Sequence, residues 1–218
     1  MPSNISDVIP DQCHVTFAQI LSRHGARDPT ASKSASYNAT IQKIHTNVKI
    51  FTGAYAFLTD YEYTLGADLL TLFGQHQMIH SGTKYYNRYG QLADHLTPFV
   101  RSSGEARVVE SAQNWTQGYH AAKLADRRAG RRDPAYPYSI LVISEDSGVN
   151  NTLNHGLCTD FEDGPDSDIA SDAQTTWADG FVPPIQARLN AGLPGANLSV
   201  SETINVMDLC PFSEHPNR

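Results

Sequence analysis

The pattern of apolar and polar positions predicts short strands separated by longer helical segments. Apolar runs rich in β-branched and aromatic residues predict strands at 14–21, 96–100 and 139–144. Helical spacing of apolar residues predicts helices at 37–48, 71–89, 105–126, 183–192 and 201–209. Because strands that alternate with helices are typical of α/β architecture, we expect a mostly parallel sheet.

Several positions add detail to this pattern. The strand at 139–144 is expected to be the most clearly buried, whereas residues 150–180 are polar, acidic and weakly periodic. Ser199 and Glu202 have the spacing of a capping box, which marks the start of the last helix. Trp115 and Tyr119 lie one helical turn apart, which predicts that they belong to a core.

The sharpest motif, Arg23-His24-Gly25-Ala26-Arg27, directly follows the first predicted strand. Polar residues at the carboxyl end of a strand in an open α/β sheet lie where ligands bind. Arginine forks match phosphate oxygens, and positive neighbours keep one imidazole nitrogen unprotonated and nucleophilic in acid. This combination favours phosphoryl transfer through a phosphohistidine. Taken alone, the motif is also compatible with an ordinary surface loop.

A second polar segment strengthens this hypothesis. The residues Arg101-Ser102-Ser103-Gly104-Glu105-Ala106-Arg107 follow another predicted strand and open a predicted helix. The N-terminus of a helix offers backbone donors and a favourable dipole to an anion. Two such segments after two strands predict a phosphate site.

Six blocks of sequence lie in a single order through nearly the whole chain. They are Cys-His-Val-Thr-Phe-Ala-Gln-Ile-Leu-Ser-Arg-His-Gly-Ala-Arg-Asp-Pro-Thr at 13–30, Tyr-Thr-Leu-Gly-Ala-Asp at 63–68, the helix start at 70–74, Phe-Val-Arg-Ser-Ser-Gly-Glu-Ala-Arg-Val at 99–108, Val-Ile-Ser-Glu at 142–145 and Asn-Asn-Thr-Leu at 150–153. In these blocks the chain resembles the histidine acid phosphatase family, and within it the secreted fungal-type phytases.

The resemblance implies a fold and a division of the chain. The expected fold is a histidine-phosphatase-like, mostly parallel sheet flanked by helices, with a helical cap subdomain and with the sheet incomplete in this chain. Residues 1–33 and 64–150 are expected to belong to the α/β phosphatase core. Residues 34–63 and 151–218 are expected to form the helix-rich cap and connecting segments.

The resemblance also implies roles for individual residues. His24 would be the nucleophile, and Arg23, Arg27 and Arg107 would bind the transferred phosphate. Arg107 is preferred to Arg101 because the family's third arginine is the last one of that loop, at the helix start.

The expected substrate follows from the phytase branch. Lys33 matches a lysine that helps to hold other phosphates of phytate, inositol hexakisphosphate. The chain departs from that branch at Asp28, where tyrosine is usual, and a carboxylate beside a phosphate pocket weakens anion binding or shifts its pH range. A broad-specificity acid phosphatase is therefore an alternative interpretation.

A larger departure concerns the family's late His-Asp pair, which supplies the acid that protonates the leaving alcohol. None of the nine histidines is followed by aspartate. Family members also continue past the region matched here, so we expect the N-terminal part of an enzyme, with a complementary C-terminal chain as partner. In the resembling phytases, Cys13, Cys158 and Cys210 match positions whose disulfide partners lie later in the chain. A catalytically incomplete fragment is a further alternative.

Composition excludes several classes of function. A net charge of −7 argues against nucleic acid or an anionic membrane as the main partner, and the sequence has no apolar run long enough to span a membrane. His76 and His80 are spaced like metal ligands, but nothing nearby completes a set, and the acidic residues of 160–172 do not fit a calcium loop. We therefore expect no metal and no cofactor.

Glycosylation motifs favour the secretory route. Asn-x-Ser/Thr sequons start at Asn4, Asn38, Asn114, Asn150 and Asn197. Five sequons exceed the number expected by chance from this composition, about 2. The sequence therefore predicts a secreted, glycosylated protein.

Overall fold

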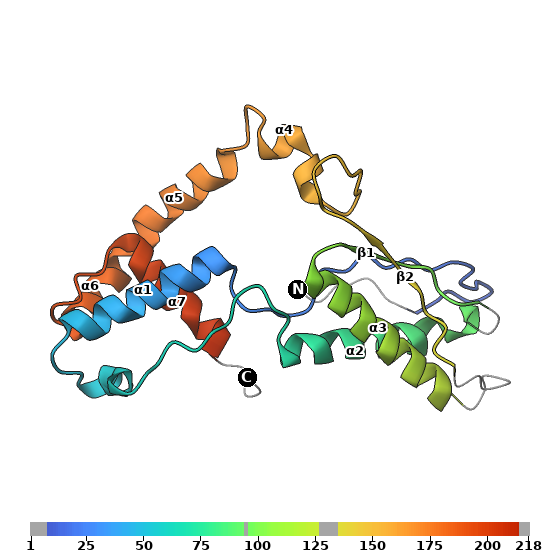
Figure 1. Ribbon diagram of the computed structural model, residues 1–218, viewed down its shortest axis with the longest axis horizontal. Coiled ribbons are helices and arrows are strands. Elements are labelled where there is room, and N and C mark those ends of the chain that lie inside the picture. The colour runs from blue at the N-terminus through green and yellow to red at the C-terminus, as the bar shows by residue number, and fades with distance from the viewer. Residues whose placement is uncertain (1–7, 94–95, 127–134, 214–218) are drawn as a thin grey trace. The chain divides into compact units, whose positions relative to one another are not determined.

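The computed structural model (Figure 1) describes residues 8–93, 96–126 and 135–213. The chain divides into two units. Unit 1 contains Met1–Ala26 and Gly74–Glu145, and unit 2 contains Arg27–Phe73 and Asp146–Arg218. The division into a phosphatase core and a cap stays a prediction.

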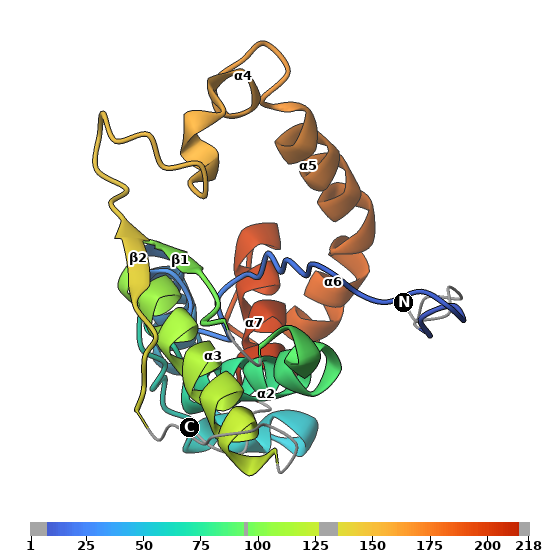
Figure 2. The same cartoon turned by 90° about the vertical axis from the view of Figure 1, so that its right-hand side faces the viewer.

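Unit 1 contains a parallel strand pair joined by a helix. β1 (Val100–Ser103) pairs with β2 (Ile140–Ile143) in a register that places Val100 opposite Ile140 and Ser103 opposite Ile143. The connecting helix α3 (Ala106–Ala125) contacts both strands (Figures 1 and 2). This β–α–β arrangement confirms the predicted α/β class and the parallel direction of the sheet.

The first strand predicted from the sequence is wrong. Residues 14–21 have no regular secondary structure, and the described part of the chain contains a sheet of only two strands. Phe17 and Leu21 are 76% and 82% exposed. Because β propensity reflects packing and pairing with a neighbouring strand, an apolar run without such a neighbour does not form a strand.

Two further expectations about the strands are corrected. β1 begins where the strand predicted at 96–100 ends, so that Ser102 and Ser103 are buried strand residues and not loop residues. The expected deep burial of 139–144 is also wrong, since Leu141 and Val142 of β2 are exposed. Both errors arise because the position and the burial of a strand depend on which elements pair with it and cover it, and this is not encoded locally.

The two long helices of unit 1 cross at glycines. α2 (Leu72–Tyr89) is followed by the short 3₁₀ helix η2 (Gly90–Leu92). A Cβ on Gly82 of α2 would lie 2.0 Å from the Trp115 carbonyl oxygen, and one on Gly118 of α3 would lie 1.9 Å from the Ile79 carbonyl oxygen. The buried core beside this crossing contains Met78, Tyr86, Ala93, Trp115 and Tyr119, which confirms the predicted burial of Trp115 and Tyr119.

Unit 2 is helical. Its elements are α1 (Ala31–Asn47), η1 (Gly53–Thr59), η3 (His155–Leu157), α4 (Thr159–Glu162), α5 (Ile169–Phe181), α6 (Pro183–Gly192) and α7 (Val200–Ser213). α1 begins six residues before its predicted start, whereas α6 matches its predicted range. α5 lies almost entirely in the segment 150–180, whose weak periodicity predicts no helix. The unit's buried apolar core contains Tyr37, Ile41, Ile44, Val48, Leu58, Leu193, Ala196, Leu198 and Leu209.

The predicted capping box at the start of α7 is confirmed. The Ser199 N–H donates to Glu202 Oε2 at 2.7 Å, and the Glu202 N–H donates to Ser199 Oγ at 3.2 Å. Lys43 Nζ of α1 donates to both carboxylate oxygens of Glu202, at 2.9 and 2.7 Å. The cap therefore also links α7 to α1.

This link makes the stability of unit 2 depend on pH. Burial raises the pKa of Glu202, but hydrogen bonds from Lys43 and Ser199 outweigh it, so that the pKa lies below its ordinary value of 4.5. A lowered folded-state pKa means that the unfolded chain binds the proton more tightly. The stabilisation is therefore present above pH 4.5 and is lost as the pH falls through the folded-state pKa.

We expect Glu202→Gln to lower the free energy of unfolding by about 1 kcal/mol at pH 7. The difference from the unsubstituted protein should shrink on acidification, as measured by urea unfolding between pH 7 and pH 3. Glu62→Gln, which alters an exposed carboxylate, is the matched control. A loss in the free energy of unfolding that stayed constant over this pH range in Glu202→Gln would contradict the lowered pKa of Glu202.

Candidate active site

The predicted nucleophile lies in the irregular segment that precedes Arg27. His24 is partly buried, and its Nδ1 lies 2.7 Å from the Gly25 carbonyl oxygen. A carbonyl only accepts hydrogen bonds, so Nδ1 carries the proton and donates. In the neutral ring Nε2 then has the lone pair, which makes it the atom suited to nucleophilic attack.

The backbone around His24 is held by two side chains. The Gly25 N–H donates to Ser111 Oγ of α3 at 3.1 Å, and the Ala26 N–H donates to Gln77 Oε1 of α2 at 2.8 Å. A Cβ on Gly25 would lie 2.3 Å from the Gly74 carbonyl oxygen. Only glycine allows this approach of the segment to the first turn of α2.

Arg107 lies in the first turn of α3, in the same unit as His24. Its guanidinium forms an ion pair with the Glu105 carboxylate, and its carbonyl oxygen accepts a hydrogen bond from Ser111 Oγ at 2.7 Å. Arg101 is exposed on β1. A phosphate that binds Arg107 therefore meets a guanidinium already neutralised by Glu105, and must compete with that carboxylate.

The structure connects part of the predicted site. Arg23 is exposed next to His24, and Ser111 joins the His24 segment to the turn that contains Arg107. Arg23, His24 and Arg107 thus belong to unit 1, whereas Arg27 and Lys33 belong to unit 2. The roles assigned to all five residues stay predictions.

Arg27 is positioned by its own unit. It forms an isolated antiparallel bridge with Leu70, and its Nη1 donates to the Asp28 carbonyl oxygen at 2.7 Å. Its Nη1 also lies 4.0 Å from a carboxylate oxygen of Asp68. The Asp68 carboxylate accepts a hydrogen bond from the Ala31 N–H, so it connects Arg27 to the start of α1.

Lys33 lies in the first turn of α1, above an aromatic ring. Its Nζ is 5.9 Å from the centroid of Tyr37, whose hydroxyl donates to Asp208 at 2.9 Å. Burial, and then the hydrogen bond to Asp208, raises the pKa of Tyr37 to about 12. The ring therefore stays neutral in acid and supports the ammonium by a cation–π contact.

Sequence reasoning did not find Ser111, Gln77 or Glu105. A signal existed for Ser111, which follows Arg107 by four residues and so lies one helical turn further on the same face. Its bond to Gly25 joins residues 86 positions apart, and no local pattern reveals such a contact.

Three other predicted features concern metal binding, membrane spanning and the cysteines. No group of three or more His, Cys, Asp or Glu residues in the described parts of the chain is arranged to hold a metal ion. No helix in those parts has the length and apolar character needed to cross a membrane. Cys13, Cys158 and Cys210 are all exposed.

Comparison with known proteins gives concordant results. A family model for the histidine phosphatase superfamily (branch 2) matches residues 14–218. Phytase A of Aspergillus oryzae is 48% identical over 210 residues, which cover 96% of this chain and 44% of that protein. Phytase A of Neurospora crassa is 44% identical over 219 residues, which cover 97% of this chain and 42% of that protein. The chain thus spans less than half the length of these curated relatives.

A solved structure shares the fold. The crystal structure of the phytase from D. castellii superimposes with a TM-score of 0.72 at 24% sequence identity. The superposition covers 96% of this chain and 46% of that one. This likeness agrees with the α/β class described above.

Proposed function

The chain belongs to the histidine phosphatase superfamily (branch 2), and on this premise we propose that it contributes the nucleophile of a phytase-type acid phosphatase. The observation that supports this most directly is the His24 Nδ1 contact with the Gly25 carbonyl, which leaves Nε2 as the basic nitrogen of the neutral ring. Nε2 attacks the phosphorus of a phosphate monoester, the bond to the alcohol oxygen breaks, and water then hydrolyses the phosphohistidine.

Arginines stabilise the negative charge of the transferred phosphoryl group in this proposal. Arg23 and Arg107 accompany His24 in unit 1, and Arg27 follows it by three residues in the chain. Fixed guanidinium groups supply the charge stabilisation that a metal ion gives in other phosphoryl-transfer enzymes. The proposed reaction therefore uses no metal and no organic cofactor.

Phytate is the proposed substrate. Two relatives that match nearly all of this chain are named Phytase A, and Lys33 provides a cationic group in addition to the three phosphate-binding arginines. Its ammonium lies above the Tyr37 ring, and in this proposal its role is to bind another phosphate of the inositol ring.

Two substrates distinguish the attack by His24 from the protonation of the leaving group. An aryl phosphate has a weakly basic leaving group that departs without a general acid, whereas an inositol phosphate needs one. With ³²P-labelled aryl phosphate and a denaturing alkaline quench, we expect label on the chain at His24. Absence of label would contradict the proposed function. A higher kcat/KM for the aryl ester than for phytate, with the general acid supplied, would favour the broad-specificity alternative.

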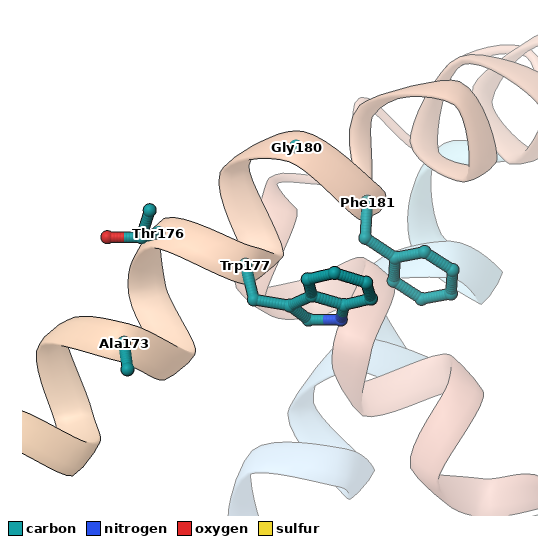
Figure 3. Close-up of a pocket in the computed structure, with 5 residues that line it drawn as sticks. All are labelled: Ala173, Thr176, Trp177, Gly180 and Phe181. Atoms are coloured by element: carbon teal, nitrogen blue, oxygen red, sulfur yellow. The ribbon is translucent and has the colours of Figure 1, made fainter.

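We propose that a complementary polypeptide, equivalent to the C-terminal part of the relatives, binds this chain and supplies the general acid. Apolar side chains on α5 support this. Ile169, Ala173, Trp177 and Phe181 follow one another at four-residue spacing, and no residue of α5 is buried. Trp177 is 71% exposed and stacks on Phe181 with ring centroids 5.9 Å apart (Figure 3).

Trp177 offers a direct test of this binding. The chain has two tryptophans, and the other, Trp115, is buried. We expect the C-terminal part of Aspergillus oryzae Phytase A, produced separately, to form a complex in which Trp177 emission shifts to shorter wavelength and iodide quenching falls. Trp177→Phe should show neither change. A complex with unchanged Trp177 emission, or no complex by size-exclusion chromatography, would contradict the proposal.

We also propose that the protein is secreted, with glycans at a subset of its sequons. Asn38, Asn150 and Asn197 are exposed, whereas Asn114 is 8% exposed and its Nδ2 donates to the Glu110 carbonyl oxygen in α3. Asn4 lies outside the described residues. A glycan at Asn114 is incompatible with this packing. Peptide mass mapping after enzymatic glycan release should mark the exposed sites and not Asn114; a glycan at Asn114 in the folded protein would contradict the structure.

A further inference from the structure

Ser111 makes one more hydrogen bond than its place in a helix requires. It is 3% exposed in α3, and its hydroxyl donates to the Arg107 carbonyl oxygen at 2.7 Å. This bond to the residue four positions earlier is the usual way in which a helical serine or threonine is satisfied. Thr40 and Thr46 of α1 do the same with Ser36 and Gln42. The bond that Ser111 accepts from the Gly25 N–H at 3.1 Å is additional.

This additional bond acts on the peptide group that orients His24. The Gly25 carbonyl accepts the Nδ1–H of His24, and the Gly25 N–H is held by Ser111. The other side of the same residue meets the Gly74 carbonyl, so Gly25 cannot move toward α2. The hydroxyl thus connects the imidazole to the backbone of Arg107, through three hydrogen bonds that all lie within unit 1.

We propose that Ser111, assisted by Gln77, is a positioning residue that holds the His24 imidazole in a fixed position relative to the first turn of α3. The inference rests on the proposed function, because it assigns the consequence to the attack by Nε2. Gln77 holds the next amide, the Ala26 N–H, from α2. Two consecutive amides are therefore anchored to two different helices, which fixes the segment in two directions. A nucleophile displaced by about 1 Å loses about 10²-fold in rate.

The expected effect of Ser111→Ala is a loss of rate without a loss of phosphate binding. The substitution leaves the buried Gly25 N–H without its acceptor while improving helix propensity. We expect the rate of ³²P labelling of His24 from aryl phosphate to fall about 10–100-fold. The dissociation constant of inorganic phosphate, measured by calorimetry, should change less than twofold. Gln77→Ala, at an exposed position that the fold tolerates, should slow labelling about 3–10-fold.

Thr83→Val is the matched control for general destabilisation. Thr83 Oγ1 also lies at the α2–α3 crossing, where it donates to the carbonyl oxygens of Ile79 and Gly118, but it does not contact the His24 segment. Its removal should lower the unfolding midpoint and leave the labelling rate unchanged. Equal slowing by Thr83→Val, or labelling within twofold of the unsubstituted rate in both Ser111→Ala and Gln77→Ala, would overturn the proposal.

Amide hydrogen exchange tests the role of Ser111 independently of the proposed function. If the unsubstituted chain takes up no label, the proposed function has failed. Exchange of the Gly25 amide still tests the geometry, because it should be protected in the unsubstituted chain and exchange at least about 10-fold faster in Ser111→Ala. Unchanged Gly25 protection in that variant would overturn the role of Ser111 on its own.

Discussion

Substitution of His24 by alanine is expected to abolish covalent labelling by aryl phosphate and to lower phosphate release by about 10⁴-fold or more. The alanine side chain has no nitrogen to form the bond to phosphorus, and the only remaining route is direct attack by water. Phosphate binding should persist, since Arg23, Arg27 and Arg107 are untouched. The measurement is ³²P incorporation after an alkaline denaturing quench, together with release of inorganic phosphate.

His76→Ala is the matched control, because His76 is an exposed histidine on α2 in the same unit. It should label as the unsubstituted chain does. Label retained by His24→Ala at the unsubstituted rate would refute the nucleophile assignment. Loss of label in both variants would point to an effect of histidine removal on folding, and a circular dichroism spectrum distinguishes that case.

The largest expected effect on stability comes from Gly118→Ala. In an open helix interior this change stabilises by about 1 kcal/mol because alanine has the higher helix propensity. At the crossing of α2 and α3 the new Cβ would lie 1.9 Å from the Ile79 carbonyl oxygen, a backbone atom that cannot rotate away. The helices must separate, which disrupts the packing of Trp115 and Tyr119. We expect a net loss of about 3 kcal/mol.

Gly180→Ala in α5 is the matched control, because nothing lies within 4 Å of the added Cβ. It should raise the free energy of unfolding by about 0.5–1 kcal/mol. Urea unfolding followed by near-ultraviolet circular dichroism measures both variants. A Gly118→Ala midpoint that rises together with that of Gly180→Ala would show that the two helices do not cross at these glycines.

The residues proposed for the candidate site can be recognised from the sequence because they lie in short motifs. His24, Arg23, Arg27 and Lys33 lie within eleven consecutive residues, and Arg107 closes a second short block. The residues that hold these groups were not predictable. Ser111 and Gln77 contact the His24 segment across 86 and 51 positions, and Glu105 faces Arg107 only in the folded first turn of α3.

The helices likewise include some that the sequence predicts and one that it does not. α3, α6 and the capping box of α7 follow from spacing and caps, because a helix makes its hydrogen bonds within its own segment. α5 was missed, since its apolar residues are few and sit in an acidic segment. The exposure of its apolar face could not be predicted either, because it depends on whether another element of the fold packs against that face.

The sequence by itself determined the β–α–β order from β1 through α3 to β2 and the residue proposed as the nucleophile, and it predicted phosphoryl-transfer chemistry. Only the tertiary structure decided that residues 14–21 form no strand, that Ser102 and Ser103 are buried in β1, and that Asn114 is not an accessible sequon. The physical reason is common to these cases. Strand pairing and burial are relations between distant segments, whereas helix caps and catalytic motifs are complete within a few neighbouring residues.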